Sequence, residues 1–394
     1  MKPLLFSVLA RPTHPTRDGA AIRNYHLLRA LGERFRVRAF ALRAPHLAAA
    51  DAEYPAGVEV EEFPQGARIF RRAAAAAASL LFGGPYSPRL YRSAALSARL
   101  RDASDSERPA WIVAHTYHVG PLALGRGLPA WIDFHNLDSQ IWSRVGETAS
   151  SRTVRAFARL QAPRIREFEA GLAALAAGIS CVSALDAARL LELKPGPAPL
   201  VVPNGVDLSR YEFVRERPGD GGLLFVGDLS WPPNAEALRW FGANVWPLVR
   251  ASAPRARVRV LGRAAPADLV RSAPEWEFLG EGGDTRPHWA RADAAIVPLR
   301  AGGGTRLKVL EAAACGVPVL STSVGAEGLD LEAEREILLR DDPESFAEAA
   351  ARLVERADLR ASLAEAAREK VERRYDWRRI AASFADELLR RVRP

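Results

Sequence analysis

Short apolar runs alternate with longer helical segments along the whole chain. In its first half these runs occupy residues 4–10, 37–42, 58–63, 111–115, 131–135 and 178–183. Segments rich in alanine, leucine and arginine, with the spacing of helices, separate them. Continuous apolar strands that alternate with helices predict a parallel β-sheet covered by helices on both of its faces.

The same pattern starts again after a polar stretch with prolines and glycines, residues 203–222. The apolar runs of this second half occupy residues 223–229, 257–262, 276–280, 294–299 and 317–322. A chain of 394 residues is too long for one ordinary core. We therefore predict two doubly wound α/β domains in tandem, residues 1–203 and 204–376. Because ligands bind at the carboxyl ends of strands in such sheets, we expect the site in the cleft between the domains.

Composition narrows the class of protein. Hydrophobic residues make up 48% of the chain and charged residues 26%, which is typical of a folded globular protein. The two cysteines, Cys181 and Cys315, match no metal spacing and form no disulfide scaffold, so we expect a reducing cytoplasm. The opening stretch with Pro3 favours a first strand over a signal peptide. The longest uncharged apolar stretch, which starts at Ala73, is too short to span a membrane.

The net charge of +8 comes almost entirely from arginine. Arginines cluster at residues 68–72 and through residues 144–166. Such clusters fit a solvated basic helix face, contact with an acidic membrane surface, or nucleic-acid binding. No nucleic-acid motif accompanies the charge, so we predict no nucleic-acid partner. Peripheral contact with the inner membrane face stays open beside the solvated-face interpretation.

The strongest functional signal is a turn between a predicted strand and a predicted helix. The residues of this turn are Gly302, Gly303 and Gly304, and Thr305 begins the predicted helix. The helix is expected to continue from there to Cys315, and Gly316 to end it. A strand, a glycine turn and a helix present backbone N–H groups and a positive helix end to an anion.

Charged residues reinforce that interpretation. Gly304, Lys308 and Glu311 share one stripe of the predicted helix, and Arg306 falls in its first turn. An ammonium beside a carboxylate suits a ligand with a phosphate and a hydroxyl-rich group. The spacing matches neither a P-loop nor a dinucleotide fingerprint. The alternative is a tight turn followed by a surface Lys–Glu pair.

Several segments together resemble the retaining glycosyltransferases of family 4. These are "SCVSALDAARL" (180–190), "VVPNGVDLSRY" (201–211), "LLFVGDLSWPPNAEAL" (223–238), the glycine-turn segment itself, and "RYDWRRIAASFADELLRRV" (374–392). The resemblance implies the GT-B fold, in which two Rossmann-like domains face each other across a cleft. It also implies that the closing helix, residues 377–394, crosses back to the N-terminal domain.

The resemblance assigns roles to residues of the second domain. Glu311 matches the second glutamate of the family's E-x7-E pattern, which binds the ribose hydroxyls of the nucleotide. Gly303 stands where the first glutamate, a donor-sugar ligand, is expected. Gly227 ends the first strand of this domain, but the basic residues that often follow it are replaced by Asp228 and uncharged residues. Arg306 and Lys308 are therefore our candidates for the catalytic partners of the diphosphate.

Residues of the first domain complete the predicted site. His135 matches a family histidine near the donor sugar and is our third catalytic candidate. His115 and His118 end the preceding strand and are expected to face the acceptor. Gly19 occupies the family's N-terminal glycine-loop position, and Arg23 points either to the cleft or to solvent. We predict no metal, because no third ligand accompanies His115 and His118.

The implied activity is transfer of a hexose from a nucleotide-diphosphate sugar to an acceptor with retention of configuration. The nucleotide sugar is a substrate, and no cofactor is expected. The implied acceptor is a saccharide or a lipid-linked molecule of cell-envelope polysaccharide synthesis. Two alternatives remain open: a nucleotide-sugar-binding subunit with little activity, and a sugar-nucleotide epimerase of the same fold.

Overall fold

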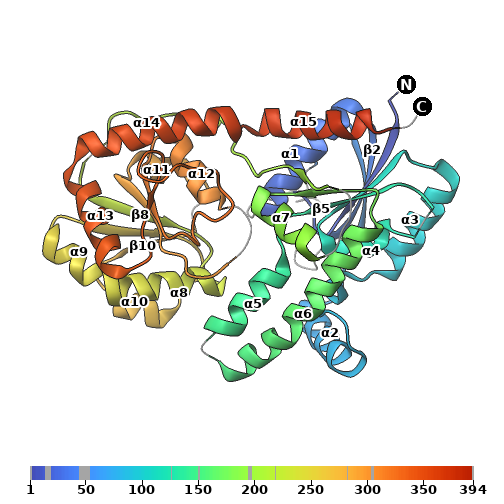
Figure 1. The fold of residues 1–394 in the computed structure, drawn as a ribbon, viewed down its shortest axis with the longest axis horizontal. Helices are drawn as coiled ribbons and strands as arrows, with labels where there is room; N and C mark the ends of the chain where they lie inside the picture. Colours follow the sequence, from blue (N-terminus) through green and yellow to red (C-terminus); the bar gives the residue numbers. More distant parts are fainter. Residues whose placement is uncertain are drawn as a thin grey trace. The chain divides into compact units, whose positions relative to one another are not determined.

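The structure is a computed structural model and describes residues 2–13, 19–43, 54–125, 127–149, 151–193, 198–217, 219–281, 283–302 and 306–392 (Figure 1). The chain forms two compact units. Unit 1 comprises Met1–Asn204 and Arg378–Pro394, and unit 2 comprises Gly205–Trp377. No helix of the described residues is long and apolar enough to cross a membrane.

Unit 1 is built on a parallel sheet of seven strands in the order β3-β2-β1-β4-β5-β6-β7. The strands are β1 (Leu4–Leu9), β2 (Arg36–Arg43), β3 (Val58–Pro64), β4 (Trp111–His115), β5 (Ala130–Phe134), β6 (Gly178–Cys181) and β7 (Leu200–Val201). The six apolar runs of the first half are confirmed as β1 to β6. Strand β7 was not predicted, because a strand of two residues has no hydrophobic period.

Helices cover both faces of this sheet. They are α1 (Gly19–Arg34), α2 (Arg68–Phe82), α3 (Ala94–Glu107), α4 (Gly120–Ala123), α5 (Asp138–Thr148), α6 (Arg152–Leu175), α7 (Ala184–Leu193) and α15 (Trp377–Arg390). The expected return of the closing helix to the N-terminal domain is confirmed: Trp111 donates from Nε1 to the carbonyl of Leu388 at 3.1 Å. The Trp131 and Phe384 rings also meet, with centroids 5.9 Å apart.

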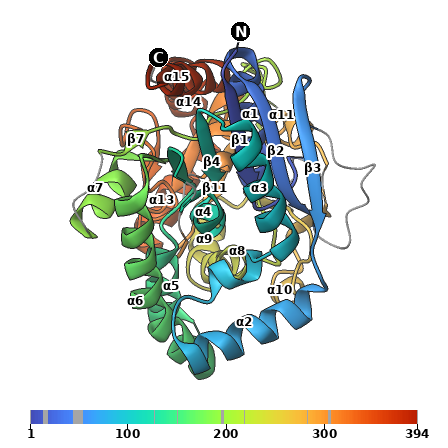
Figure 2. The same ribbon diagram turned by 90° about the vertical axis from the view of Figure 1, so that its right-hand side faces the viewer.

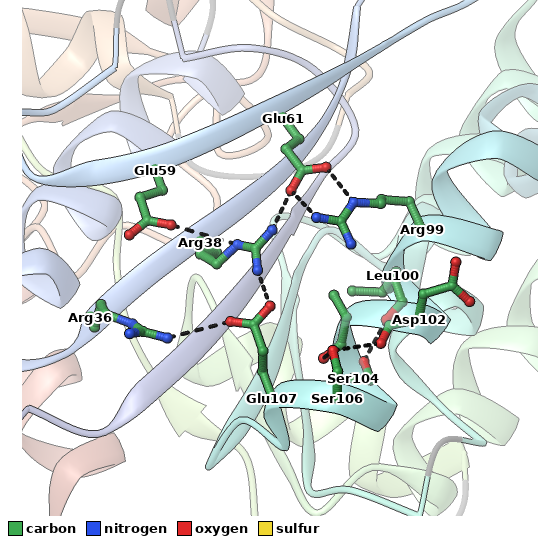
Figure 3. Close-up of polar contacts among 11 residues, drawn as sticks. Arg36, Arg38, Glu59, Glu61, Arg99, Leu100, Asp102, Ser104, Ser106 and Glu107 are labelled. Atoms are coloured by element: carbon green, nitrogen blue, oxygen red, sulfur yellow. Dashed lines mark hydrogen bonds and ion pairs between the residues drawn. The ribbon is translucent and has the colours of Figure 1, made fainter.

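A network of charges closes one edge of this sheet (Figure 3). Arg38 of β2 contacts Glu61 of β3 and Glu107 of α3. Glu61 also accepts from Arg99 at 2.8 Å, and Glu107 from Arg36 at 3.4 Å. The Arg38 guanidinium carbon lies 5.7 Å from the Phe6 ring centroid. The aliphatic part of Arg38 is buried while its guanidinium is paired with carboxylates. These contacts join β2 and β3 to α3.

Unit 2 has a parallel sheet of six strands in the order β10-β9-β8-β11-β12-β13. The strands are β8 (Gly222–Val226), β9 (Arg257–Leu261), β10 (Glu277–Gly280), β11 (Ala294–Val297), β12 (Val319–Ser321) and β13 (Leu338–Leu339). The five predicted runs are confirmed, and β13 was missed because it is too short. The helices are α8 (Pro232–Trp240), α9 (Trp246–Ser252), α10 (Ala267–Ser272), α11 (Arg286–Ala290), α12 (Leu307–Ala314), α13 (Pro343–Glu355) and α14 (Ala357–Arg374).

One tight contact in unit 1 depends on a missing side chain. Gly178 of β6 pairs with Trp131 of β5, and a Cβ added to Gly178 would lie 2.2 Å from Trp131 Cε3. Gly178→Ala should therefore force the indole to move and lower the free energy of unfolding of unit 1 by about 1–3 kcal/mol. Urea unfolding followed by tryptophan fluorescence measures this change.

Gly171 of α6 provides the matched control, since a Cβ there meets nothing within 4 Å. Gly171→Ala should raise stability by up to about 1 kcal/mol through helix propensity. Equal effects from the two substitutions would contradict the packing argument.

Candidate functional site

The centre of unit 2 brings together residues that are far apart in the sequence. Strands β8 and β11 are parallel neighbours, so their carboxyl ends meet at one edge of the sheet. Gly227 follows β8, and a Cβ there would lie 2.8 Å from Lys308 Nζ and 2.8 Å from Asn234 Nδ2. The sequence placed Gly227 and Lys308 in one site, and the fold brings them into contact.

The backbone under this contact is unusually close. A Cβ on Gly262, after β9, would lie 1.9 Å from the carbonyl oxygen of Gly227. The amide of Gly227 donates to the carbonyl of Leu261 at 2.9 Å. Only the absence of a side chain at residue 262 allows the loops after β8 and β9 to touch.

Lys308 lies on α12 in a half-buried, mostly apolar setting. Its Nζ donates to Asn234 Oδ1 at 3.1 Å and lies 4.2 Å from the centroid of the Phe225 ring. Burial, followed by the neighbouring Arg306 charge, lowers the pKa of Lys308 to about 7, while Glu311 opposes the shift. Because two cations adjoin here, an anion bound beside them would raise that pKa again.

Arg306 is buried and is the N-cap residue of α12. Its backbone is extended, with φ −85° and ψ 93°. The helix begins at Leu307, so the expectation that Arg306 falls in the first helical turn is wrong by one residue. Gly302 has φ +135°, and a Cβ there would lie 2.7 Å from Arg306 Nη2 and 2.8 Å from Trp231. Gly302 thus leaves room for the guanidinium. Gly303, Gly304 and Thr305 lie outside the described residues.

Glu311 lies one turn after Lys308 on α12. Its Oε2 accepts from Thr285 Oγ1 at 3.3 Å and from Trp289 Nε1 at 3.4 Å. Burial raises the pKa of Glu311, and hydrogen bonds from Trp289, Tyr211 and Thr285 oppose that rise. The carboxylate is therefore held by neutral donors, an arrangement that suits binding of hydroxyl groups.

A basic residue does approach the loop after β8. Asp228 accepts from Arg263 Nε at 2.9 Å and from Nη2 at 2.6 Å. Arg263 follows β9, so inspection of the β8 loop alone could not find it. The signal was available in the predicted topology, because β8 and β9 end at the same edge of the sheet.

In unit 1, Arg23 of α1 is buried, with 1% of its side chain exposed. It pairs with Asp133 of β5 through Nη2 to Oδ1 at 2.7 Å and Nε to Oδ2 at 2.8 Å. Its Nη1 donates to the carbonyl of Val202 at 2.8 Å and to Asn204 Oδ1 at 3.1 Å. The expectation that Arg23 points to solvent is wrong, because this pairing buries the guanidinium.

Asp133 is also the centre of a histidine cluster that the sequence analysis missed. His115 and His135 end neighbouring strands, and one ligand atom from each lies within 4.8 Å of the others and of Asp133. His135 Nε2 is 3.2 Å from Asp133 Oδ2. Burial lowers the pKa of His115 to about 3 and also lowers that of His135. Both rings are therefore neutral near pH 7.

This cluster does not fit a metal ion. Both Asp133 oxygens already accept from Arg23, and Oδ1 also accepts from Ser180 Oγ at 2.6 Å. A divalent cation would have to displace a buried guanidinium or sit beside it, which is electrostatically unfavourable.

His118 lies apart from His115. His115 is fully buried, so the expectation that it faces an acceptor alongside His118 is wrong. The His118 ring lies 4.1 Å from the centroid of Tyr117 and 3.2 Å, at Nε2, from Asp138 Oδ2. Thr116 connects the two histidines with φ +103°, an unusual conformation for a β-branched residue. This bend turns His118 away from the core.

Gly19 is the first residue of α1, so it belongs to the helix that it was expected to precede. The two groups of predicted residues thus occupy separate units. Unit 2 brings together Arg306, Lys308, Glu311, Gly227 and Gly302. Unit 1 brings His115, His135 and Arg23 around Asp133.

Two family models match the chain. One, described as "Glycosyltransferase Family 4", matches residues 17–210, and the other, "Glycosyl transferases group 1", matches residues 220–356. Among curated proteins, D-inositol 3-phosphate glycosyltransferase of Saccharomonospora viridis is 32% identical over 237 residues, covering 52% of this chain and 53% of that protein. The matches span between 37% and 53% of the length of the first curated relatives.

Solved structures match over the whole chain. Sucrose-phosphate synthase of Thermosynechococcus elongatus has a TM-score of 0.75 at 16% identity, covering 100% of this chain and 99% of that one. Anabaena HepE in complex with UDP-glucose has a TM-score of 0.66 at 16% identity, covering 98% and 99%. The predicted fold class, two tandem Rossmann-like domains of the GT-B type, is confirmed.

The Arg23–Asp133 pair yields a stability prediction. Asp133→Asn leaves the buried guanidinium without its counter-charge, so the free energy of unfolding of unit 1 should fall by about 3–5 kcal/mol. Urea unfolding followed by circular dichroism measures the change.

Asp386→Asn is the matched control in the same unit. It removes an exposed partner of Arg34, whose Nε lies 2.6 Å from Asp386 Oδ1, and should leave the unfolding midpoint unchanged. An Asp133→Asn protein as stable as this control would show that the buried pair is dispensable.

Proposed function

The chain belongs to glycosyltransferase family 4, and from this premise we propose that it transfers a hexose from a nucleotide-diphosphate sugar to an acceptor. The observation that carries the proposal is that Arg306 precedes α12 directly, while Lys308 and Glu311 lie on this helix. Two cations next to each other, with a carboxylate one turn away, complement a diphosphate joined to a ribose.

Arg306 and Lys308 bind the diphosphate, and Glu311 accepts hydrogen bonds from the ribose hydroxyls. HepE, which has this fold, was solved with UDP-glucose, and this supports a nucleotide sugar as the donor class. Asn234 holds Lys308 Nζ through a hydrogen bond of 3.1 Å. This bond positions the ammonium before the donor arrives.

Transfer proceeds with retention of configuration. The bond between the anomeric carbon and the diphosphate oxygen breaks, and the acceptor oxygen bonds to the anomeric carbon on the same face. The proton of the acceptor hydroxyl passes to an oxygen of the leaving diphosphate. Lys308 and Arg306 stabilise the charge that develops on this leaving group. His135, neutral near pH 7, offers a hydrogen bond to the donor sugar without adding charge.

The acceptor is a saccharide or a lipid-linked molecule of cell-envelope synthesis. Gly303, in place of the family's first glutamate, favours one competing function, a nucleotide-sugar-binding subunit with little turnover. Incubation of the protein with UDP-, GDP- and ADP-hexoses separates these functions. Release of nucleotide diphosphate with formation of a glycoside supports the transferase. Binding without release supports the subunit, and conversion of the sugar nucleotide without any acceptor indicates an epimerase.

Loss of one cation should affect the chemical step. Lys308→Ala is expected to lower kcat at least ~10²-fold, the scale for removing one group that stabilises transition-state charge. Steady-state assays of nucleotide diphosphate release with the best donor measure this change. Near-normal turnover would exclude Lys308 from catalysis. Lys370 lies on α14 and forms an ion pair with Glu336, and Lys370→Ala is the matched control, which should keep kcat.

The lowered pKa of Lys308 predicts a pH dependence of nucleotide binding. A diphosphate favours the ammonium form, so binding takes up a proton above pH 7, where the free side chain is largely neutral. Affinity for a nucleoside diphosphate should therefore fall by up to ~10-fold per pH unit between pH 7 and about 9. Titration calorimetry in buffers of different ionisation enthalpy measures both affinity and proton uptake.

Lys308→Arg is the control for this dependence. Arginine stays charged throughout the range, so its affinity for nucleoside diphosphate should change little with pH. The same slope in both proteins would assign the titration to another group.

A further inference from the structure

Helix α2 of unit 1 is amphipathic in the opposite sense to an ordinary surface helix. Its large apolar residues Ile69, Phe70, Leu80, Leu81 and Phe82 are between 57% and 80% exposed. The side of α2 that packs against the rest of unit 1 carries Ser79, whose Oγ accepts a hydrogen bond from Gln161 Nε2 at 2.9 Å. Arg71 also turns inward and donates to the carbonyl of Leu90. Burial of polar groups and exposure of apolar ones is costly in water.

Seven exposed residues of α2 form one continuous stripe, and Arg72 and Phe82, which are also exposed, lie outside it. Its members are Ile69, Phe70, Ala73, Ala74, Ala77, Leu80 and Leu81. Their spacing of one, three or four residues places all of them on one side of the helix. The helix of fifteen residues is about 22 Å long. This stripe carries no charged side chain, so it offers an uninterrupted apolar surface to whatever covers it. Figures 1 and 2 show the ribbon of α2, the helix that carries the stripe.

The residues around the stripe are basic. From residue 64 to residue 98 the sequence has no aspartate or glutamate, and its arginines are Arg68, Arg71, Arg72, Arg89 and Arg92. Arg72 and Arg92 are exposed. Burial, Arg92 and Arg164 together lower the pKa of Arg89, as expected where guanidinium groups gather without carboxylates between them.

We propose that the α2 stripe docks onto an anionic lipid surface, with its apolar side chains in the acyl boundary and the flanking arginines at the headgroups. Apolar residues beside arginines are the features of a helix that lies in a membrane interface. A second copy of the chain is a poorer partner, because it would bring one arginine-bearing segment without acidic residues, residues 64–98, against another. The proposal is independent of the proposed transferase activity.

Flotation of the 394-residue chain with lipid vesicles tests the docking. One set of vesicles contains phosphatidylcholine alone, and the other contains about one third phosphatidylglycerol. Binding should require the anionic lipid and weaken when salt rises from about 0.1 M to about 0.5 M. Equal flotation with both vesicles, or none with either, overturns the proposal.

Variants locate the surface. The double variant Phe70→Asp, Leu81→Asp should bind anionic vesicles at least ~10-fold more weakly, because it places charges in the acyl boundary. Leu175→Asp, at the exposed end of α6, is the matched control and should bind like the wild type. Arg72→Glu with Arg92→Glu tests the charge without touching the stripe, and should also weaken anionic binding.

Thermal unfolding by circular dichroism checks that each variant folds. If the stripe variant does not fold, the arginine variant tests the proposal in its place. Wild-type binding by a folded stripe variant overturns the proposal. So does a dimer, measured by light scattering, that the stripe variant dissociates while vesicle binding is unaffected. Nucleotide binding should be the same in all variants, which keeps this test separate from the test of the donor site.

Discussion

The parallel arrangement of the strands is the constraint on which both candidate sites depend. In each unit the carboxyl ends of neighbouring strands meet at one edge, so side chains that follow different strands become neighbours. In unit 1 this edge gathers two histidines around Asp133, and in unit 2 it sets Gly227 against Lys308. The buried Arg23 then ties α1 to β5 and to the segment that ends unit 1.

The two sites use charge in opposite ways. In unit 1 a full guanidinium–carboxylate pair is satisfied inside the protein, and the histidines beside it are kept neutral. In unit 2 two cations adjoin each other, and burial lowers the pKa of Lys308 to about 7. The Arg23–Asp133 pair of unit 1 is a structural ion pair whose two charges already balance each other. The arrangement in unit 2 gains most from an incoming anion, because that anion relieves both repulsion and desolvation.

The sequence was sufficient for the fold class and for most strands, because buried parallel strands form continuous apolar runs between helices. It was insufficient for β7 and β13, which are two residues long and are defined by pairing alone. In the sites, a local motif such as the α12 segment was readable. The partners Asp133, Asn234 and Arg263 come from other strands and loops, and the direction of Arg23 depends on a carboxylate that is 110 residues away in sequence.

The contact between Gly262 and the Gly227 carbonyl limits how this site can change. Since neither loop can shift without moving the other, the ends of β8 and β9 act as one rigid floor beneath Lys308. A side chain at residue 262 would lift the floor and tilt the ammonium, although residue 262 follows β9 and Lys308 lies on α12. Residue 262 is therefore constrained by the backbone of another loop, and a change there would reach the cations of the site through the fold alone.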